Sequence, residues 1–196
     1  MPQNFTSAPE NYEIHSFVSE GPDIVVTPAE HKGRGVLHSH SFYEIVYVAE
    51  GFTLHQSCGR ITMLITGDFF FVKPGEVHSY INAYQTKLYN LLFVPAALGD
   101  SFSALSALPG LDEMFSPSGE SLDPTHRLLH VSIGERRNIE SALEKMIGER
   151  ENKNVGWEVS LKARLTSLLI KYARMYDEQY DEHSAGGKKR SDNDYY

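Results

Sequence analysis

Short apolar runs with turn residues between them fill the chain from residue 12 to residue 94. The runs are YEIHSFV, DIVVTP, YEIVYVAEG, FTLHQS, RITMLI, DFFFV, VHSYIN and TKLYNLLFV, rich in β-branched and aromatic residues. Glycine and proline bound nearly all of them, as at Gly21-Pro22, Gly67-Asp68 and Pro74-Gly75. Strands at this regular spacing predict an antiparallel sandwich or small barrel within residues 1–94.

The pattern changes after residue 94. Residues 95–134 contain a Ser-, Pro- and Gly-rich stretch with scattered apolar residues, which predicts a connection that packs on the barrel. Apolar residues then recur at helical spacing, which predicts helices over residues 135–151 and 156–180. Residues 181–196 combine a glycine pair with mixed charge, and we expect a linker or disordered tail there.

The second predicted helix carries one regular apolar stripe. Its members are spaced 4, 3, 4 and 3 residues apart, as in a coiled-coil packing face: Leu161, Leu165, Leu168, Tyr172 and Met175. The stripe packs on residues 135–151, on a second subunit, or on both, because it is wider than one partner helix covers. The sequence therefore predicts a two-helix dimerisation region over residues 135–180, and a homodimer.

Composition narrows the function classes. The chain has 196 residues and a formal charge of −8, with 14 acidic and 6 basic side chains in residues 1–134. This chain by itself is therefore not expected to bind nucleic acid or an anionic membrane. One cysteine excludes an internal disulfide, and the sequence shows neither a signal peptide nor an apolar run of membrane-spanning length, so we expect a cytoplasmic protein.

Two segments hold the candidate chemistry. HSHSFYEIVYVAEG contains His38, His40 and Glu44, and GDFFFVKPGEVHSYIN contains His78. On a strand, residues i and i+2 point to one face, about 6.6 Å apart, so these side chains can converge inside a barrel. Three imidazoles and a carboxylate suit a divalent transition metal such as Zn, Ni, Fe or Mn. They can equally bind a ligand by hydrogen bonds without a metal. The other histidines, His55 and His130 among them, lack this spacing and are interpreted as surface or packing residues.

The two segments resemble the two cupin motifs, with all four metal-binding positions present. The second motif departs at Lys73, because its proline comes one residue late, at Pro74. Together with LYNLLFVP and the helices at 135–180, the segments resemble the N-terminal effector-binding and dimerisation domain of AraC-family transcription regulators, some of which respond to sugars. The resemblance implies an N-terminal arm and a mainly β cupin barrel over residues 1–94, followed by a pair of C-terminal α-helices. It also implies that DNA is contacted only by a helix-turn-helix domain outside this sequence.

This resemblance implies that a small-molecule effector binds inside the barrel and changes how the barrel packs on the terminal helices or on an N-terminal arm. The residues expected to bind that effector are His38, His40, Glu44, His78, Tyr80 and, at the barrel mouth, Arg34, although an exposed loop arginine is the simpler interpretation of Arg34. Phe42, Phe69, Phe71 and Tyr80 are expected to face the barrel interior, and this set permits a sugar, a uronate or a small aromatic acid. The alternative is a stand-alone metal-dependent cupin enzyme, a dioxygenase or sugar isomerase, which the long helices disfavour.

Overall fold

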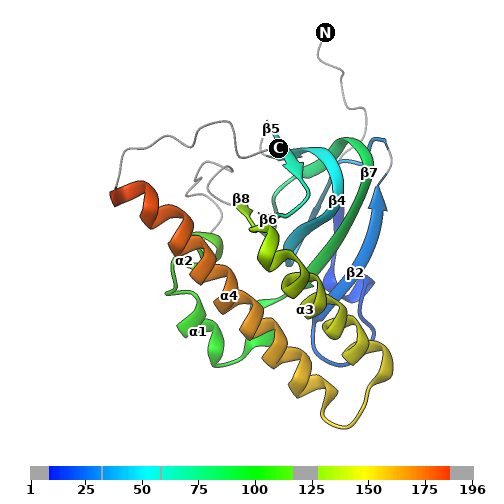
Figure 1. The fold of residues 1–196 in the computed structure, drawn as a ribbon. Coiled ribbons are helices and arrows are strands. Elements are labelled where there is room, and N and C mark those ends of the chain that lie inside the picture. Colours follow the sequence, from blue (N-terminus) through cyan, green and yellow to red (C-terminus); the bar gives the residue numbers. More distant parts are fainter. Residues whose placement is uncertain (1–8, 32, 58, 117–127, 186–196) are drawn as a thin grey trace.

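The computed structural model describes residues 9–31, 33–57, 59–116 and 128–185 (Figure 1). The strands are β1 (Glu10–Tyr12), β2 (Ile24–His31), β3 (His38–His40), β4 (Tyr43–Ser57), β5 (Arg60–Ile65), β6 (Asp68–Val72), β7 (His78–Phe93) and β8 (Leu128–His130). The helices are η1 (Ile14–Ser16), η2 (Pro95–Leu98), α1 (Ser101–Leu105), α2 (Leu111–Phe115), α3 (Ile133–Asn152) and α4 (Trp157–Ala185). A curled sheet followed by two long helices confirms the predicted fold class.

All eight strands belong to one sheet, with the long antiparallel pair β4 and β7 at its centre. Strand β4 also pairs with β6 and β5, and strand β7 also pairs with β2 and β3. The N-terminal β1 adds to β3 in parallel, with Glu10 opposite His38. This pairing places the first described residues beside the HSH segment.

The two faces of β4 exchange roles along its length. Before residue 49, Ile45 and Tyr47 pack with the helices, and the alternate residue Val46 packs in a separate cluster on the opposite face. Register shifts against β7 follow between Val48 and Phe52. Gly51 lies there at φ 81°, where a Cβ would overlap the carbonyl of Gln85. An extra residue in one strand of a pair reverses the alternation, so the inward side chains are odd-numbered beyond the bulge.

Helices α3 and α4 lie against one face of the sheet, and they enclose the main hydrophobic core with it (Figure 1). Four members of the predicted stripe, Leu161, Leu165, Leu168 and Tyr172, are buried in this core, and Met175 is partly buried against it. The stripe is therefore satisfied within the chain, as one of the two interpretations allowed. It does not offer a free surface to a second subunit.

The connection packs on the barrel and on α4 through short helices. Leu105, Leu111 and Met114 are buried in the main core. The tail was expected from residue 181, but residues 181–185 belong to α4, which continues to Ala185. Residues 1–8, Cys58, His126 and residues 186–196 lie outside the described residues, as do the side chains of His31 and His183.

The end of α3, the start of α4 and the turn between them contact the loop that leads from the N-terminal segment into β2. Arg150 donates hydrogen bonds to the carbonyl oxygens of Pro22 (3.2 Å) and Glu20 (3.1 Å). Lys153 forms an ion pair with the Glu20 carboxylate. Gly21, at φ 76°, packs so closely on Trp157 that a Cβ would overlap the indole ring. We call this contact the N-terminal clasp.

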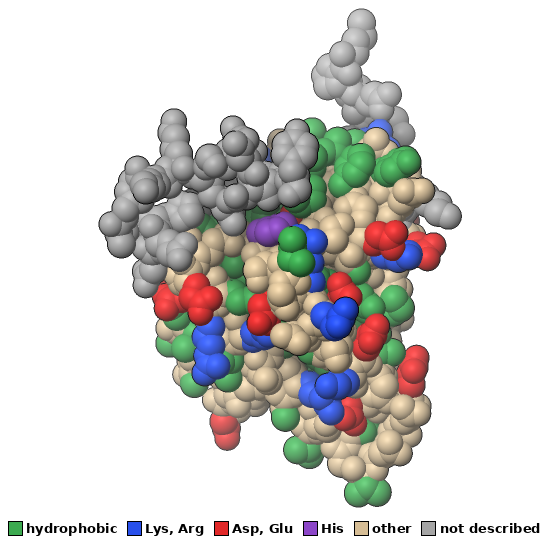
Figure 2. Space-filling model, viewed as in Figure 1, with side chains coloured by type: hydrophobic (Ala, Val, Ile, Leu, Met, Phe, Trp, Pro, Cys, Tyr) green, Lys and Arg blue, Asp and Glu red, His purple; other side chains and the backbone are tan. Residues whose placement is uncertain are grey.

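The face of the molecule drawn in Figure 2 is not divided into acidic and basic regions. On the face drawn in Figure 2, the same as in Figure 1, acidic and basic side chains are interspersed. None of the helices in the described part of the chain is both long and apolar enough to cross a membrane.

Candidate functional site

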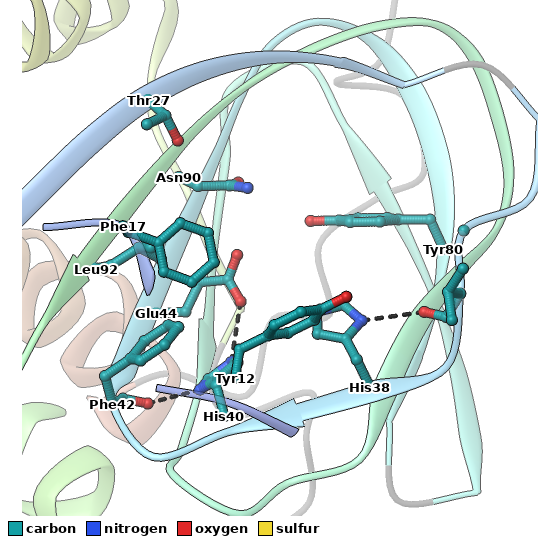
Figure 3. Close-up of a pocket in the computed structure, with 12 residues that line it drawn as sticks. Tyr12, Phe17, Thr27, His38, His40, Phe42, Glu44, Tyr80, Asn90 and Leu92 are labelled. Atoms are coloured by element: carbon teal, nitrogen blue, oxygen red, sulfur yellow. Dashed lines mark hydrogen bonds and ion pairs between the residues drawn. The ribbon is translucent and has the colours of Figure 1, made fainter. Parts of the chain in front are cut away.

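A cavity of about 390 Å³ opens inside the curled sheet (Figure 3). It is enclosed by side chains from β2, β3, β4 and β7 and by the N-terminal segment that precedes β2. The lining residues are Tyr12, Phe17, Thr27, Gly35, Val36, His38, His40, Phe42, Glu44, Tyr80, Asn90 and Leu92. A concave site with apolar walls and a few convergent polar groups is the usual form of a small-molecule site.

The polar groups of the cavity gather in two places. Glu44, Asn90 and Thr27 lie together in Figure 3, and Thr27 and Asn90 are cross-strand neighbours in the β2–β7 register. The buried Oδ1 of Asn90 has no hydrogen-bond partner among the described residues, so a ligand hydroxyl there would satisfy it. Tyr80 lies at the other end of the cavity.

Two of the predicted histidines have their ring orientation fixed by backbone carbonyls. His38 Nδ1 donates to Val36 O (3.0 Å), and His40 Nδ1 donates to Phe42 O (2.7 Å). A carbonyl oxygen only accepts, so both rings carry a proton on Nδ1. The Nε2 atom of each ring is therefore the one turned towards the rest of the cluster.

Glu44 lies between two histidines at the floor of the cavity. Its Oε2 atom is 3.0 Å from His40 Nε2 and 3.6 Å from His78 Nε2, and all three side chains are buried. Because His40 already donates through Nδ1, the short contact to Glu44 holds one further proton between Nε2 and Oε2. Both nitrogens of His40 are thus engaged within the protein.

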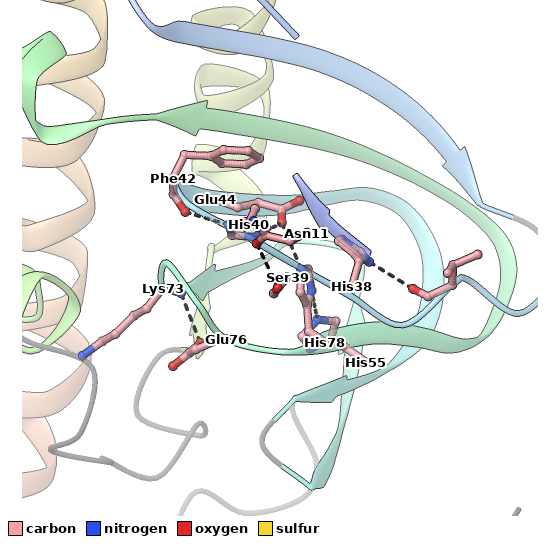
Figure 4. A network of polar contacts seen from close by, with 11 residues as sticks. Asn11, His38, Ser39, His40, Phe42, Glu44, His55, Lys73, Glu76 and His78 are labelled. Carbon is pink, nitrogen blue, oxygen red and sulfur yellow. Dashed lines mark hydrogen bonds and ion pairs between the residues drawn. The ribbon is translucent and has the colours of Figure 1, made fainter. Parts of the chain in front are cut away.

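His78 is completed by a residue that was not predicted. His55 Nε2 lies 3.0 Å from His78 Nδ1, and both rings are fully buried (Figure 4). Burial lowers the pKa of His78 well below its ordinary value, and the neighbouring His55, His38 and His40 lower it further. The interpretation of His55 as an ordinary surface or packing residue did not include this contact, which arises because the bulge near Gly51 turns this odd-numbered residue inward. The only signal for it in the sequence is the glycine.

Three of the four predicted metal ligands come together. Ligand atoms of His38, Glu44 and His78 lie within 4.8 Å of one another. His40 lies outside this group, and its two nitrogens contact Phe42 O and Glu44 Oε2. Two imidazoles and one carboxylate fit a divalent transition metal, and the buried Nε2 of His78 has no hydrogen-bond partner in the described part of the chain.

The remaining predicted ligand residues divide. Tyr80 is buried and lines the cavity, whereas Arg34 is exposed and is not among the lining residues. Phe42 lines the cavity as expected. Phe69 and Phe71 face the helices, and Phe70 packs on the inner side instead, so the expected parity on β6 was wrong by one residue.

Two polar residues serve the fold around the site. Lys73, which stands where the motif usually has proline, is buried and donates to Ser116 Oγ (2.8 Å) in the connection. His130 Nδ1 lies 2.7 Å from Asp68 Oδ1, and its Nε2 lies 3.2 Å from Arg136 Nη2. This contact joins β8 to β6 and α3 outside the cavity.

A curled β-sheet with an internal polar and aromatic cavity, covered by two C-terminal helices, defines a ligand-binding domain of the cupin type. Residues 21–169 match the family model described as the AraC-like ligand binding domain. The chain belongs to this family.

Similar proteins agree with this assignment. The HTH-type transcriptional activator RhaR of Klebsiella pneumoniae is 27% identical over 141 residues, 72% of this chain and 48% of the relative. RhaR of Escherichia coli O139:H28 is 29% identical over 107 residues, 55% of this chain and 36% of the relative. The chain thus spans less than half the length of these relatives.

Among solved structures, an RmlC-like cupin from Shewanella frigidimarina is 28% identical, with a TM-score of 0.34 over 35% of this chain and 64% of that one. A Cupin 2 conserved barrel domain protein from Salinispora arenicola is 21% identical, with a TM-score of 0.35 over 53% and 78%.

Proposed function

We propose that this chain is the effector-binding and dimerisation half of an AraC-type transcription regulator, and that it senses a small neutral polyhydroxylated molecule such as a sugar. The observation that carries the proposal is the cavity: its volume, its aromatic walls and its buried polar groups suit one sugar-sized ligand. Contact with DNA belongs to a separate domain of such a regulator.

The charge inside the cavity favours a neutral ligand over an acid. Among the described residues that line it there is one carboxylate, Glu44, and no lysine or arginine. In the cavity without a metal, a uronate or aromatic acid would place its carboxylate near Glu44 with no lysine or arginine to pair it, which is costly in a desolvated site. Hydroxyl groups, in contrast, can donate to Glu44 and Asn90.

The ligand signal would leave the cavity through the N-terminal segment. Tyr12 and Phe17 line the cavity, and the loop a few residues further on is held in the N-terminal clasp by Arg150 and Trp157. A ligand that contacts Tyr12 and Phe17 favours the arrangement in which this segment is closed. Coupling requires that the ligand bind the closed and open arrangements with different free energies.

Dimerisation is assigned to the outward face of α4. Val159, Ala163, Thr166 and Ile170 follow one another at spacings of 4, 3 and 4, and they line a shallow groove along the helix. This second row has the coiled-coil spacing of the buried stripe; Val159 and Ala163 are exposed, and Thr166 and Ile170 are half-buried. A second copy of α4 packed on this row would produce the homodimer.

We also propose that His38, Glu44 and His78 hold a divalent transition metal at the cavity floor. When bound, the metal would supply a Lewis-acid contact for a ligand hydroxyl. The residues of the chain would orient the ligand: Asn90 and Thr27 at the polar end, and Tyr80 opposite them.

Effector binding is tested by a thermal-shift screen of neutral monosaccharides against the matching uronates. A neutral sugar should raise the melting temperature, because it binds only the folded chain, and the uronates should not. Asn90→Leu should abolish the shift, while Glu50→Gln, an exposed carboxylate outside the cavity lining, should preserve it. A shift that Asn90→Leu leaves intact would contradict the site, and a response to uronates alone would contradict the ligand class.

A further inference from the structure

Two of the three histidines at the cavity floor are oriented in the same way by backbone carbonyl groups. His38 and His40 each direct Nδ1–H at a backbone carbonyl, and this contact leaves Nε2 facing the cluster. Histidines that bind metals are usually held in this way, with the second ring nitrogen donating to an acceptor. His78 is the exception, because the atom beside its Nδ1 is Nε2 of His55 rather than a carbonyl oxygen.

His55 is rigidly held where it contacts His78. Its backbone pairs with Tyr80 in the β4–β7 register, two residues from the pair formed by Ser57 and His78. Its ring lies edge-on to Phe70, with centroids 4.5 Å apart, and to Tyr80, with centroids 5.3 Å apart. The 3.0 Å contact between His55 Nε2 and His78 Nδ1 joins two fully buried rings, where leaving a polar atom unpaired is costly.

We propose that His55 is a positioning residue. Its Nε2 atom accepts a hydrogen bond from the Nδ1–H group of His78, and this contact turns the Nε2 lone pair of His78 towards His38 and Glu44. This inference rests on the metal site of the proposed function. It gives His55 the part that carbonyl oxygens take for His38 and His40. The three ligand atoms that His38, Glu44 and His78 group at the cavity floor can then all donate electron pairs.

An imidazole does one thing that a carbonyl cannot: it can also donate. With the metal absent, His55 Nε2–H can donate to His78 Nδ1, and His78 Nε2–H then faces Glu44 Oε2 at 3.6 Å. The change to the metal-binding form moves the His55 Nε2 proton to His78 Nδ1. The His78 Nε2 proton is released to solvent and His55 Nδ1 takes up one proton from solvent, so both rings remain neutral. The hydrogen bond between the rings is kept in both forms.

The first test is the affinity for Co²⁺, measured by titration of the visible absorption of the bound ion. Replacing a residue that orients a metal ligand typically weakens binding about 10–100-fold, and we expect this for His55→Phe. His55→Gln keeps a side-chain acceptor and should recover most of the affinity. His130→Gln is the matched control, because His130 is also paired to a neighbour but lies outside the cavity. His38→Ala should abolish binding.

The second measurement uses the unaltered sequence, in case His55→Phe does not fold. In ¹⁵N-histidine-labelled protein loaded with Zn²⁺, NMR should find the His78 proton on Nδ1 and a scalar coupling across the hydrogen bond to His55 Nε2. Co²⁺ affinity unchanged in His55→Phe, or a Zn²⁺-bound His78 whose Nδ1 has no hydrogen bond to His55, overturns the inference alone. Failure of the unaltered protein to bind Co²⁺ overturns it together with the metal site, whereas effector sensing depends only on the thermal-shift result.

Discussion

Gly21 is the residue at which the N-terminal segment meets the helical hairpin. Its φ of 76° and its close contact with Trp157, the single tryptophan of the chain, make two separate demands on one position. Gly59 has the same φ of 76° but no heavy atom within 4 Å of an added Cβ. The pair therefore separates backbone strain from the packing of the N-terminal clasp.

We expect Gly59→Ala to lower the free energy of unfolding by about 1–2 kcal/mol, the cost of a left-handed backbone with a Cβ. Gly21→Ala should lose a further 1–3 kcal/mol or so, because the indole must shift. Only Gly21→Ala should move the Trp157 emission to longer wavelength. Urea unfolding and fluorescence spectra measure both effects, and equal losses with equal emission would show that the clasp contributes nothing.

Some site residues could be predicted from the sequence of a single segment, whereas others depend on contacts between distant segments. His38 and Glu44 follow from strand alternation within one segment, and the second motif adds His78. His55 could not be found in this way, because its inward direction depends on the register shifts between β4 and β7. Simple alternation from Glu44 assigns His55 to the wrong face of the strand. The engagement of both His40 nitrogens depends on a loop carbonyl, which no residue pattern specifies.

At the scale of the element, α4 shows how one helix can carry two stripes of similar spacing. The inner one is buried, so Leu165→Glu should unfold the chain rather than report on its association. The outer one is open: Val159 is 73% exposed. Val155, in the turn before α4, is 108% exposed and lies off the outer row. These two valines form a matched pair for a charge substitution.

If the outer row is the dimer interface, Val159→Glu and Ala163→Glu should raise the dimer dissociation constant at least tenfold, because two carboxylates would be desolvated across the two-fold axis. Val155→Glu should leave it unchanged. Sedimentation velocity over a concentration series measures the change. A dimer that tolerates Val159→Glu as well as it does Val155→Glu would place the interface elsewhere.

For the molecule as a whole, periodicity identified the strand region and both long helices but not how they dock. The spacing of Leu161, Leu165 and Leu168 defines a packing face without naming its partner. The partner is fixed by β4 and β6, whose outer residues Tyr47 and Phe69 complete the same core. Long-range contacts of this kind depend on the register of distant strands, which local patterns do not encode.

Burying the histidine cluster also makes the stability of the whole chain depend on pH. The pKa of His78 is lowered in the folded state, chiefly by burial and then by His55, His38 and His40, whereas in the unfolded chain it should be near 6.5. Below that pH the unfolded state binds more protons than the folded state, so acid favours unfolding. The contribution is fully present above pH 7 and is lost as the pH falls below about 6.5.

At pH 5.5, one unit below the unfolded value, this single group should cost about 1.4 kcal/mol of unfolding free energy. Urea titrations at pH 7.5 and 5.5, with a chelator present, measure the loss. In His78→Asn the loss between the two pH values should be smaller by that amount, whatever the substitution does to stability at pH 7.5. His130→Asn, which removes a partly exposed histidine paired with Asp68, is the comparison. An equal pH dependence in His78→Asn and the unaltered chain would mean that His78 titrates normally, and that the cavity floor is open to water.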